Sequence, residues 1–180
     1  YGGTYNLLSN TLPRFGITTT FIDPDDPENF SKAVQENTRA FFAESLGNPK
    51  LDVLDLKAIS ANAKKAKVPF VVDNTVATPA LLNPIAHGAN IVIHSLTKYI
   101  SGNGTSMGGI IIDAGTFDWG NGQFPEFTTP SPSYHGLNYH EALGAIAFIA
   151  RVRVEGLRDL GRAPSPYNSF QVLQGLETLQ

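Results

Sequence analysis

Two short apolar runs, each leading directly into polar residues, constrain the fold of this chain more than any other feature. Residues 68–72 (VPFVV) lead into Asp73, and residues 90–94 (NIVIH) lead into Ser95. Apolar runs of this length are typical of strands that are buried on both faces, as in parallel sheets covered by helices. Parallel neighbours need a long crossover between them, and the intervening segment provides the length for one.

Other segments continue the same alternation of strands and helices. The spacing of apolar residues in 54–67 predicts an amphipathic helix with Asp55 near its start, and residues 107–112 (MGGIII) predict a third buried strand. Further segments indicate strands at 17–22 and 39–45, helices at 7–15, 27–37 and 167–179, and one long helix from residue 139 to about residue 160. We therefore expect an α/β fold in which helices sandwich a mostly parallel sheet.

Residues 114–138 differ from the rest of the chain. The segment is rich in proline and glycine and contains Trp119 together with three phenylalanines. We expect a long ordered loop that is held in place by its aromatic side chains, and loops of this length in compact domains are often functional.

Composition excludes several classes of function. The 180 residues are 42% hydrophobic, which is typical of a globular chain, and the net charge of −3 gives no electrostatic basis for binding nucleic acid or an anionic membrane. No apolar run reaches the ~18 residues of a membrane span. The absence of cysteine excludes disulfides, a thiol nucleophile and cysteine-based metal sites. It also fits a reducing compartment, and we expect a cytoplasmic protein. The four histidines lack the spacing of metal ligands, so we expect no metal.

Polar side chains follow three of the predicted strands, where open α/β sheets bind ligands. These side chains are Glu44 and Asn48, Asp73 and Thr75, and Ser95, Thr97 and Lys98. A carboxylate after a buried strand, such as Asp73, can keep a ligand nitrogen protonated. The hydroxyls of Ser95 and Thr97 beside an amine suit a phosphate. A lysine of lowered pKa at position 98 can form a Schiff base with a carbonyl.

Each of these residues also has a structural interpretation. Asp73 could cap a helix or form a turn, Lys98 could be a solvated surface residue, and Tyr1 could be an ordinary core aromatic instead of a ring that stacks on a flat ligand. The glycine-rich segment 102–109 leads into a strand and lacks the GKS or GKT of a P-loop, so it is neither a P-loop nor a Rossmann fingerprint.

Four linked motifs resemble a known family. They are YGGTY at 1–5, Glu44 with Asn48 and Pro49, VDNT with ATP at 72–79, and HSLTKY at 94–99. Together these motifs resemble the Cys/Met-metabolism family of pyridoxal-phosphate enzymes, the fold type I relatives of cystathionine γ-synthase. The resemblance spans essentially the whole chain and implies the large cofactor-binding domain of such an enzyme, with pyridoxal 5'-phosphate as the cofactor.

The resemblance implies a role for each matching residue. Lys98 matches the lysine that forms the Schiff base with the cofactor and then moves protons, and Asp73 matches the carboxylate paired with the pyridine nitrogen. Ser95 and Thr97 match hydroxyls on the cofactor phosphate. Tyr1 matches the aromatic residue that stacks on the ring and assists proton transfer. Asn48 matches a contact to the ring's phenolic oxygen, and Thr75 matches a residue close to the ring, whereas Glu44 receives no role.

Within the family, the segments at 115–125 and 132–136 resemble the insertion of O-acetylhomoserine sulfhydrylases. This similarity implies γ-replacement on O-acetylhomoserine by sulfide or methanethiol, giving homocysteine or methionine. Gly3 departs from methionine γ-lyases, which carry a cysteine at the matching position. The alternatives are a cystathionine γ-synthase or γ-lyase, an O-succinylhomoserine sulfhydrylase, an inactive fragment that acts only as a structural or binding module, and a generic nucleotide-binding domain.

The resemblance also implies an incomplete enzyme. We expect residues 1–138 to form the central part of the cofactor-binding domain, and residues 139–180 to form a long helix and the start of the connection to a C-terminal domain. The chain then represents somewhat under half of a family member, without the segments that complete the phosphate site and grip the substrate carboxylate. Family members assemble as homodimers and homotetramers, so exposed apolar surface is expected.

Overall fold

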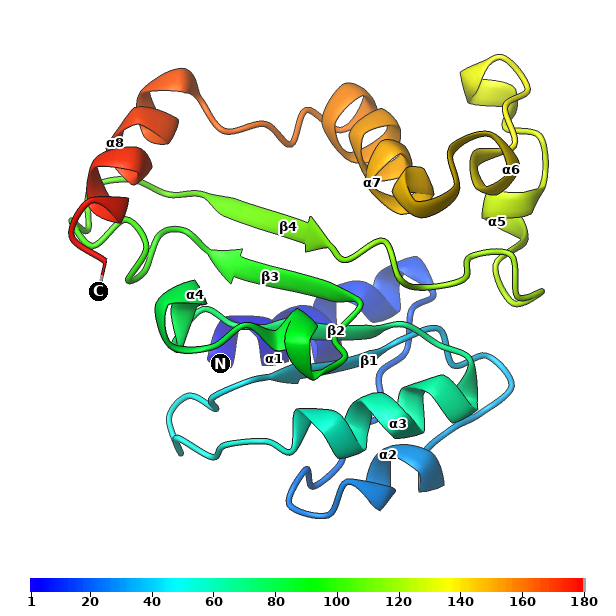
Figure 1. The fold of residues 1–180 in the computed structure, drawn as a ribbon, viewed down its shortest axis with the longest axis horizontal. Coiled ribbons are helices and arrows are strands. Elements are labelled where there is room, and N and C mark those ends of the chain that lie inside the picture. The colour runs from blue at the N-terminus through cyan, green and yellow to red at the C-terminus, as the bar shows by residue number, and fades with distance from the viewer. Residues whose placement is uncertain (180) are drawn as a thin grey trace.

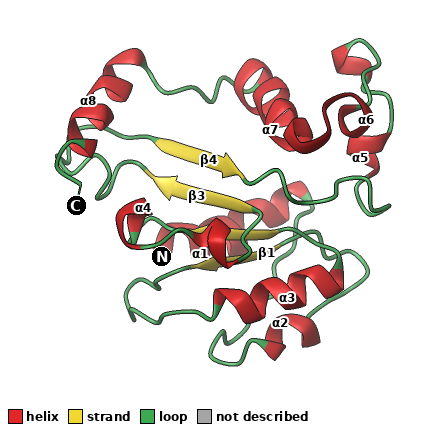
Figure 2. Cartoon of the chain, in the orientation of Figure 1, coloured by secondary structure: helices red, strands yellow, loops and turns green. Residues whose placement is uncertain are grey.

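The computed structural model describes residues 1–179 and contains a four-stranded sheet with helices packed on both faces (Figure 1, Figure 2). The strands occur in the spatial order β1 (Phe41–Glu44), β2 (Phe70–Asp73), β3 (Ile91–Ser95) and β4 (Gly109–Asp113). The first three are parallel, and β4 runs antiparallel to β3. The expected α/β fold with a mostly parallel sheet is therefore confirmed.

Helices precede, connect and follow the strands. They are α1 (Gly2–Asn6), α2 (Glu28–Lys32), α3 (Leu56–Ala66), α4 (Thr78–Leu81), α5 (Pro125–Thr128), α6 (Tyr139–Leu143), α7 (Ala147–Arg151) and α8 (Pro166–Leu176). The predicted amphipathic helix is α3. It begins where the carboxylate of Asp55 accepts a hydrogen bond from the backbone N–H of Ala58, and it ends at Lys67 in the left-handed conformation. No helix within residues 1–179 is long and apolar enough to cross a bilayer.

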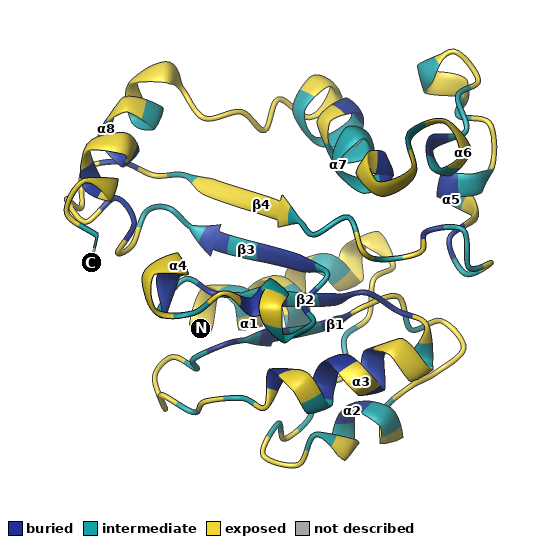
Figure 3. Ribbon diagram, viewed as in Figure 1, coloured by how far each residue is buried: buried dark blue, intermediate teal, exposed yellow. Residues whose placement is uncertain are grey.

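The two faces of the sheet support two separate cores, and Figure 3 shows the buried strands β2 and β3 between them. Because side chains alternate along a strand, Phe70 and Val72 point to one face and Val71 to the other. The first face packs against α2 and α3, and Ile59 of α3 is fully buried in this core. The second face packs against the aromatic segment that follows β4.

The aromatic side chains anchor the segment 114–138, as the sequence predicts. Trp119 is only 5% exposed and stacks on Phe127 and Phe148, with ring centroids 4.4 and 5.0 Å apart. Arg39 adds a bidentate ion pair with Glu126, both contacts being 3.0 Å. The segment is not entirely loop, because it contains α5 and a 3₁₀ turn at Pro132–Tyr134.

Three predictions of regular structure are wrong. Residues 107–112 do not form a strand buried on both faces, because β4 lies at the edge of the sheet and its isoleucines at 110, 111 and 112 are between 36% and 43% exposed. Residues 17–22 do not form a strand, because no neighbouring strand pairs with them and their large apolar side chains Ile17 and Phe21 are each 51% exposed. The single helix expected from residue 139 to about 160 is broken at Gly144, whose φ of 52° and ψ of −120° lie outside the helical region. After α7 the chain continues as a π-helix at Val152–Asp159.

The close packing of α8 leads to a test of stability. A Cβ at Gly175 would overlap the carbonyl oxygen of Ser101 and lie 2.6 Å from that of Ile100, and neither backbone atom can move away easily. We expect Gly175→Ala to lower the free energy of unfolding by about 1–3 kcal/mol in denaturant titrations. Gly156→Ala is the control, since its nearest neighbour would be Val152 Cγ1 at 3.8 Å. Equal stability of the two variants would contradict this packing.

His94 leads to a test of pH dependence. It lies in β3, is 4% exposed, and its Nδ1 has no hydrogen-bond partner within the described residues. Burial lowers the pKa of His94 below its usual 6.5, against smaller opposing effects of the Asn74 backbone and the Asp73 charge. The unfolded chain therefore binds a proton more readily than the folded chain, so stability present above about pH 6.5 is lost as the pH falls through the folded pKa.

We expect the free energy of unfolding to decrease as the pH is lowered from 7.5 to about 5, and His94→Leu to reduce that decrease. His135→Asn is the matched control, because His135 is exposed and asparagine tolerates its φ of 56°. A pH profile that is unchanged in His94→Leu would show that the buried imidazole is not the group responsible.

Candidate active site

The predicted site residues lie at the carboxyl ends of the parallel strands. Glu44 ends β1, Asp73 ends β2 and Ser95 ends β3. In the sheet register Glu44 pairs with Asp73, and Asp73 pairs with Ile93, two residues before Ser95. Because paired residues in neighbouring strands share a face, the three polar side chains project from the same face of the sheet.

A hydroxyl connects the ends of β2 and β3. Oδ1 of Asp73 accepts hydrogen bonds from the backbone N–H and the hydroxyl of Thr75, at 3.0 and 2.5 Å. The same hydroxyl oxygen accepts a hydrogen bond from the backbone N–H of Ser95 at 2.8 Å. Thr75 therefore orients the Asp73 carboxylate, and within the described residues Oδ2 of Asp73 has no hydrogen bond and is free for a ligand.

Asn74 is a supporting residue to which the sequence analysis gave no role. It is fully buried, accepts a hydrogen bond from the Ser45 hydroxyl at 2.6 Å, and donates to the carbonyl oxygens of Thr78 and Leu82 at 3.0 and 2.9 Å. An asparagine at the end of a buried apolar run is the signal that could have identified it, because a buried amide requires partners.

Lys98 and Tyr1 meet although 97 positions separate them in the sequence. Lys98 lies in the exposed turn after β3, and its Nζ is 5.4 Å from the centroid of the Tyr1 ring. This distance permits a cation–π contact. The turn is held by the hydrogen bond from the Gly102 N–H to the Lys98 carbonyl oxygen at 2.9 Å, so the glycine-rich segment begins beside Lys98.

Gly3 makes room for the Tyr1 ring. A Cβ at residue 3 would lie 2.8 Å from Cε1 of Tyr1, closer than real side chains approach. Any larger residue at this position therefore displaces the ring that faces Lys98. Glycine at position 3, where the family resemblance led us to expect a cysteine only in methionine γ-lyases, thus leaves the space that the Tyr1 ring occupies.

The remaining predicted residues, Thr97, Ser95 and Asn48, differ in whether their side chains already make hydrogen bonds. The Thr97 hydroxyl donates to the Gly108 carbonyl oxygen at 3.3 Å and accepts from the Gly108 N–H at 3.1 Å, so it already binds the glycine-rich segment. Within residues 1–179 the Ser95 hydroxyl and the Asn48 carboxamide have no hydrogen bonds. Asn48 is exposed, and its backbone N–H donates to Oε2 of Glu44 at 3.2 Å.

These groups match the chemistry of pyridoxal phosphate. An accessible amine at Lys98 can react with its aldehyde, the free oxygen of Asp73 can accept from its pyridine nitrogen, and the hydroxyl of Ser95 can donate to its phosphate. The Tyr1 ring offers a flat apolar surface. The assigned roles stay predictions, but the residues that carry them fit the cofactor.

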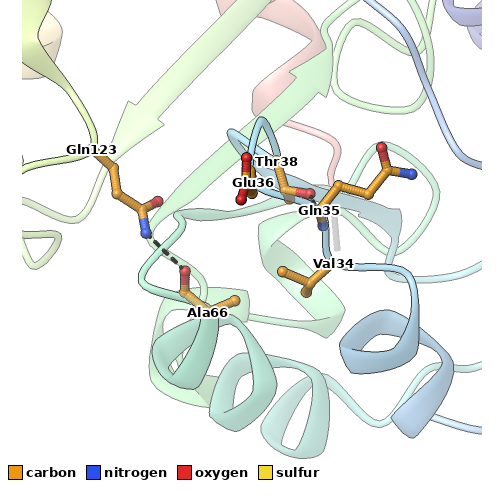
Figure 4. Close-up of a pocket in the computed structure, with 6 residues that line it drawn as sticks. All are labelled: Val34, Gln35, Glu36, Thr38, Ala66 and Gln123. Carbon is orange, nitrogen blue, oxygen red and sulfur yellow. Dashed lines mark hydrogen bonds between the residues drawn. The ribbon is translucent and has the colours of Figure 1, made fainter.

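A cavity elsewhere in the molecule is lined by none of the predicted residues. It has a volume of about 510 Å³ and lies between the segment before β1, the end of α3 and the aromatic segment (Figure 4). Gln123 spans its wall through a 3.4 Å hydrogen bond to the Ala66 carbonyl oxygen, and Glu36 is the one ionisable side chain among the lining residues. The described lining offers neither an amine nor a pair of titratable groups, so the carboxyl ends of the strands are the better candidate site.

Comparison with known proteins points to one enzyme family. A family model described as Cys/Met metabolism PLP-dependent enzyme matches residues 1–180. The chain is 59% identical to an O-acetyl-L-homoserine sulfhydrylase of Leptospira meyeri and 49% identical to one of Corynebacterium glutamicum, in each case over 99% of this chain and 42% of the relative. It therefore spans about two fifths of the length of these relatives.

Solved structures show the same similarity. A crystal structure from Campylobacter jejuni, described as an O-acetylhomoserine (thiol)-lyase with an N'-pyridoxyl-lysine-5'-monophosphate residue, matches with a TM-score of 0.94 and 46% identity over 99% of this chain and 44% of that chain. The O-acetylhomoserine sulfhydrylase of Wolinella succinogenes matches with a TM-score of 0.81 and 36% identity, over 98% and 47% of the two chains. On the evidence of sequence and fold together, the chain belongs to the Cys/Met metabolism family of enzymes that depend on pyridoxal phosphate.

Proposed function

We propose that this protein is an O-acetylhomoserine sulfhydrylase. The reaction replaces the acetoxy group on Cγ of O-acetyl-L-homoserine with sulfide, giving homocysteine and acetate, and methanethiol in place of sulfide gives methionine. The observation that carries this proposal is the 59% identity to the Leptospira meyeri sulfhydrylase over 99% of the chain. The 48% identity to the homocysteine/cysteine synthase of Saccharomyces cerevisiae supports a place in methionine and cysteine biosynthesis.

Four side chains would hold the cofactor. Lys98 would bind its aldehyde carbon, Oδ2 of Asp73 its pyridine nitrogen, and Ser95 its phosphate, with the ring of Tyr1 against its face. When bound, the cofactor supplies an electron-accepting ring that stabilises negative charge on the substrate carbon next to the amino group.

The other predicted residues would support this arrangement. Thr75 keeps Oδ1 of Asp73 occupied, so the carboxylate presents Oδ2 in one orientation. Asn48 would face the phenolic oxygen of the ring. Thr97 would turn its hydroxyl away from the Gly108 carbonyl oxygen and donate it to the phosphate, since its 3.3 Å bond to that oxygen is long for a hydroxyl donor.

Proton transfer would fall to Lys98 and Tyr1. We assign to Nζ of Lys98, in its neutral form, the removal of the substrate Cα proton. The Tyr1 ring lies within reach of this amine, and its hydroxyl would assist the transfer. The anionic Asp73 would favour a protonated ring nitrogen and so strengthen the ring as an electron acceptor.

Assembly as a homodimer or homotetramer is part of the proposal. Exposed apolar side chains within residues 1–22, among them Tyr5, Phe15 and Phe21, support this assembly. Covering such surface in a subunit interface stabilises the assembled chains. The cytoplasmic location stays a prediction.

Substitution of Lys98 tests the catalytic assignment. We expect the full-length protein to show a visible absorption band that borohydride abolishes, with the added mass on Lys98. In Lys98→Ala the band should be lost and turnover should fall at least about 100-fold, because the variant lacks both the cofactor anchor and the base. Lys65→Ala, on the exposed side of α3, is the control. Full turnover with an unchanged band in Lys98→Ala would refute the assignment.

A substrate comparison tests the reaction. With purified full-length protein we expect turnover of O-acetylhomoserine to exceed that of O-succinylhomoserine, and sulfide to be used in preference to cysteine. A preference for succinylhomoserine with cysteine would instead favour a cystathionine γ-synthase.

A further inference from the structure

Glu44 connects two segments that both contribute to the proposed cofactor site. Its side chain is 17% exposed, and Oε1 forms an ion pair of 2.7 Å with the main-chain nitrogen of Tyr1, which is a terminal ammonium in this chain. Oε2 accepts a hydrogen bond from the backbone N–H of Asn48 at 3.2 Å. In a longer chain this nitrogen is an amide, whose one N–H can donate to the same carboxylate oxygen.

We propose that Glu44 is a positioning residue, which sets the place of the Tyr1 ring and the Asn48 carboxamide relative to Lys98. The proposal rests on the proposed function, because it concerns the same cofactor site. An ionised carboxylate suits the task, since it only accepts hydrogen bonds and its two oxygens can serve two N–H donors at once.

The surroundings of Tyr1 and Asn48 explain why an external anchor is needed. Both residues are exposed, and within residues 1–179 neither side chain makes a hydrogen bond. The Tyr1 ring does face Lys98, but this contact orients the ring and does not hold the main chain at the sheet. Glu44 supplies that connection, because it extends from the last residue of β1, whose own position the sheet determines.

Glu44 is distinct from Asp73 in spite of their direct pairing in the sheet. Thr75 binds Oδ1 of Asp73 and leaves Oδ2 free, whereas both oxygens of Glu44 face main-chain nitrogens. Asp73 is therefore available to a ligand, and Glu44 acts through Tyr1 and Asn48. This difference separates a cofactor contact from a residue that arranges such contacts.

The substitution Glu44→Gln in the full-length protein tests the proposal. Glutamine keeps one acceptor oxygen and turns an NH₂ donor toward the other main-chain N–H, so one of the two segments is released. We expect the dissociation constant for pyridoxal phosphate to rise about 10- to 100-fold, as for loss of a hydrogen bond to a charged group. We also expect weaker circular dichroism in the visible band of the remaining bound cofactor, because its ring is held less firmly.

Glu36→Gln is the matched control, since Glu36 lies at the distant cavity of Figure 4. A purely structural role for Glu44 would lower the melting temperature but leave the cofactor affinity and its dichroism at saturation unchanged, and that result would overturn the proposal. If Glu44→Gln does not fold, Glu44→Asp tests the proposal instead. Its shorter carboxylate reaches only one N–H, so we expect a smaller loss of cofactor affinity. Affinity and dichroism equal to those of the unmodified protein would overturn the proposal.

Cofactor binding and turnover, measured separately, distinguish the role of Glu44 from the proposed reaction. Cofactor binding by the unmodified protein without turnover of O-acetylhomoserine would contradict the substrate, while the comparison with Glu44→Gln would still decide the role of Glu44. Normal turnover with unchanged cofactor binding in Glu44→Gln would overturn the role of Glu44 alone. An unmodified protein that binds no pyridoxal phosphate would overturn both.

Discussion

The fully buried side chain of Asn74 joins the end of β1, the end of β2 and the chain around α4, and the candidate site is arranged beside it. Its backbone N–H also donates to the Ile93 carbonyl oxygen in β3 at 2.9 Å. Leaving one buried polar partner without a hydrogen bond costs about 1–3 kcal/mol, so these bonds hold β2 firmly where it ends. Because neighbouring side chains alternate, an inward Asn74 leaves Asp73 on the opposite face, where the ligand groups gather.

The position of the site could be predicted from the sequence, but its internal arrangement could not. Buried runs that end in Asp73 and Ser95 lead to one end of a parallel sheet, and the structure places both residues there. No local pattern, however, brings Tyr1 to Lys98 or Glu44 to Tyr1, because these contacts depend on how distant segments pack. The family resemblance suggested roles for Tyr1 and Lys98 but none for Glu44, whose contacts are visible only in three dimensions.

Each error in the predicted elements has its own physical origin. The β-branched residues at 17–22 favour an extended backbone, but a strand also needs a neighbour to complete its hydrogen bonds. In the region after residue 139 the apolar spacing is helical on both sides of Gly144, and only the backbone angles of that glycine show that the helix is broken. The aromatic segment was predicted better, because a cluster of large rings around Trp119 buries its own surface.

The arrangement of β4 has a consequence for handling the chain by itself. This strand pairs with β3 on one side only within the described residues, and its isoleucines at 110, 111 and 112 are between 36% and 43% exposed. Unpaired N–H and C=O groups beside exposed isoleucines form a template onto which another extended chain can add. Residues 1–180 on their own thus present an aggregation-prone edge, and their solubility depends on keeping that edge covered or diluted.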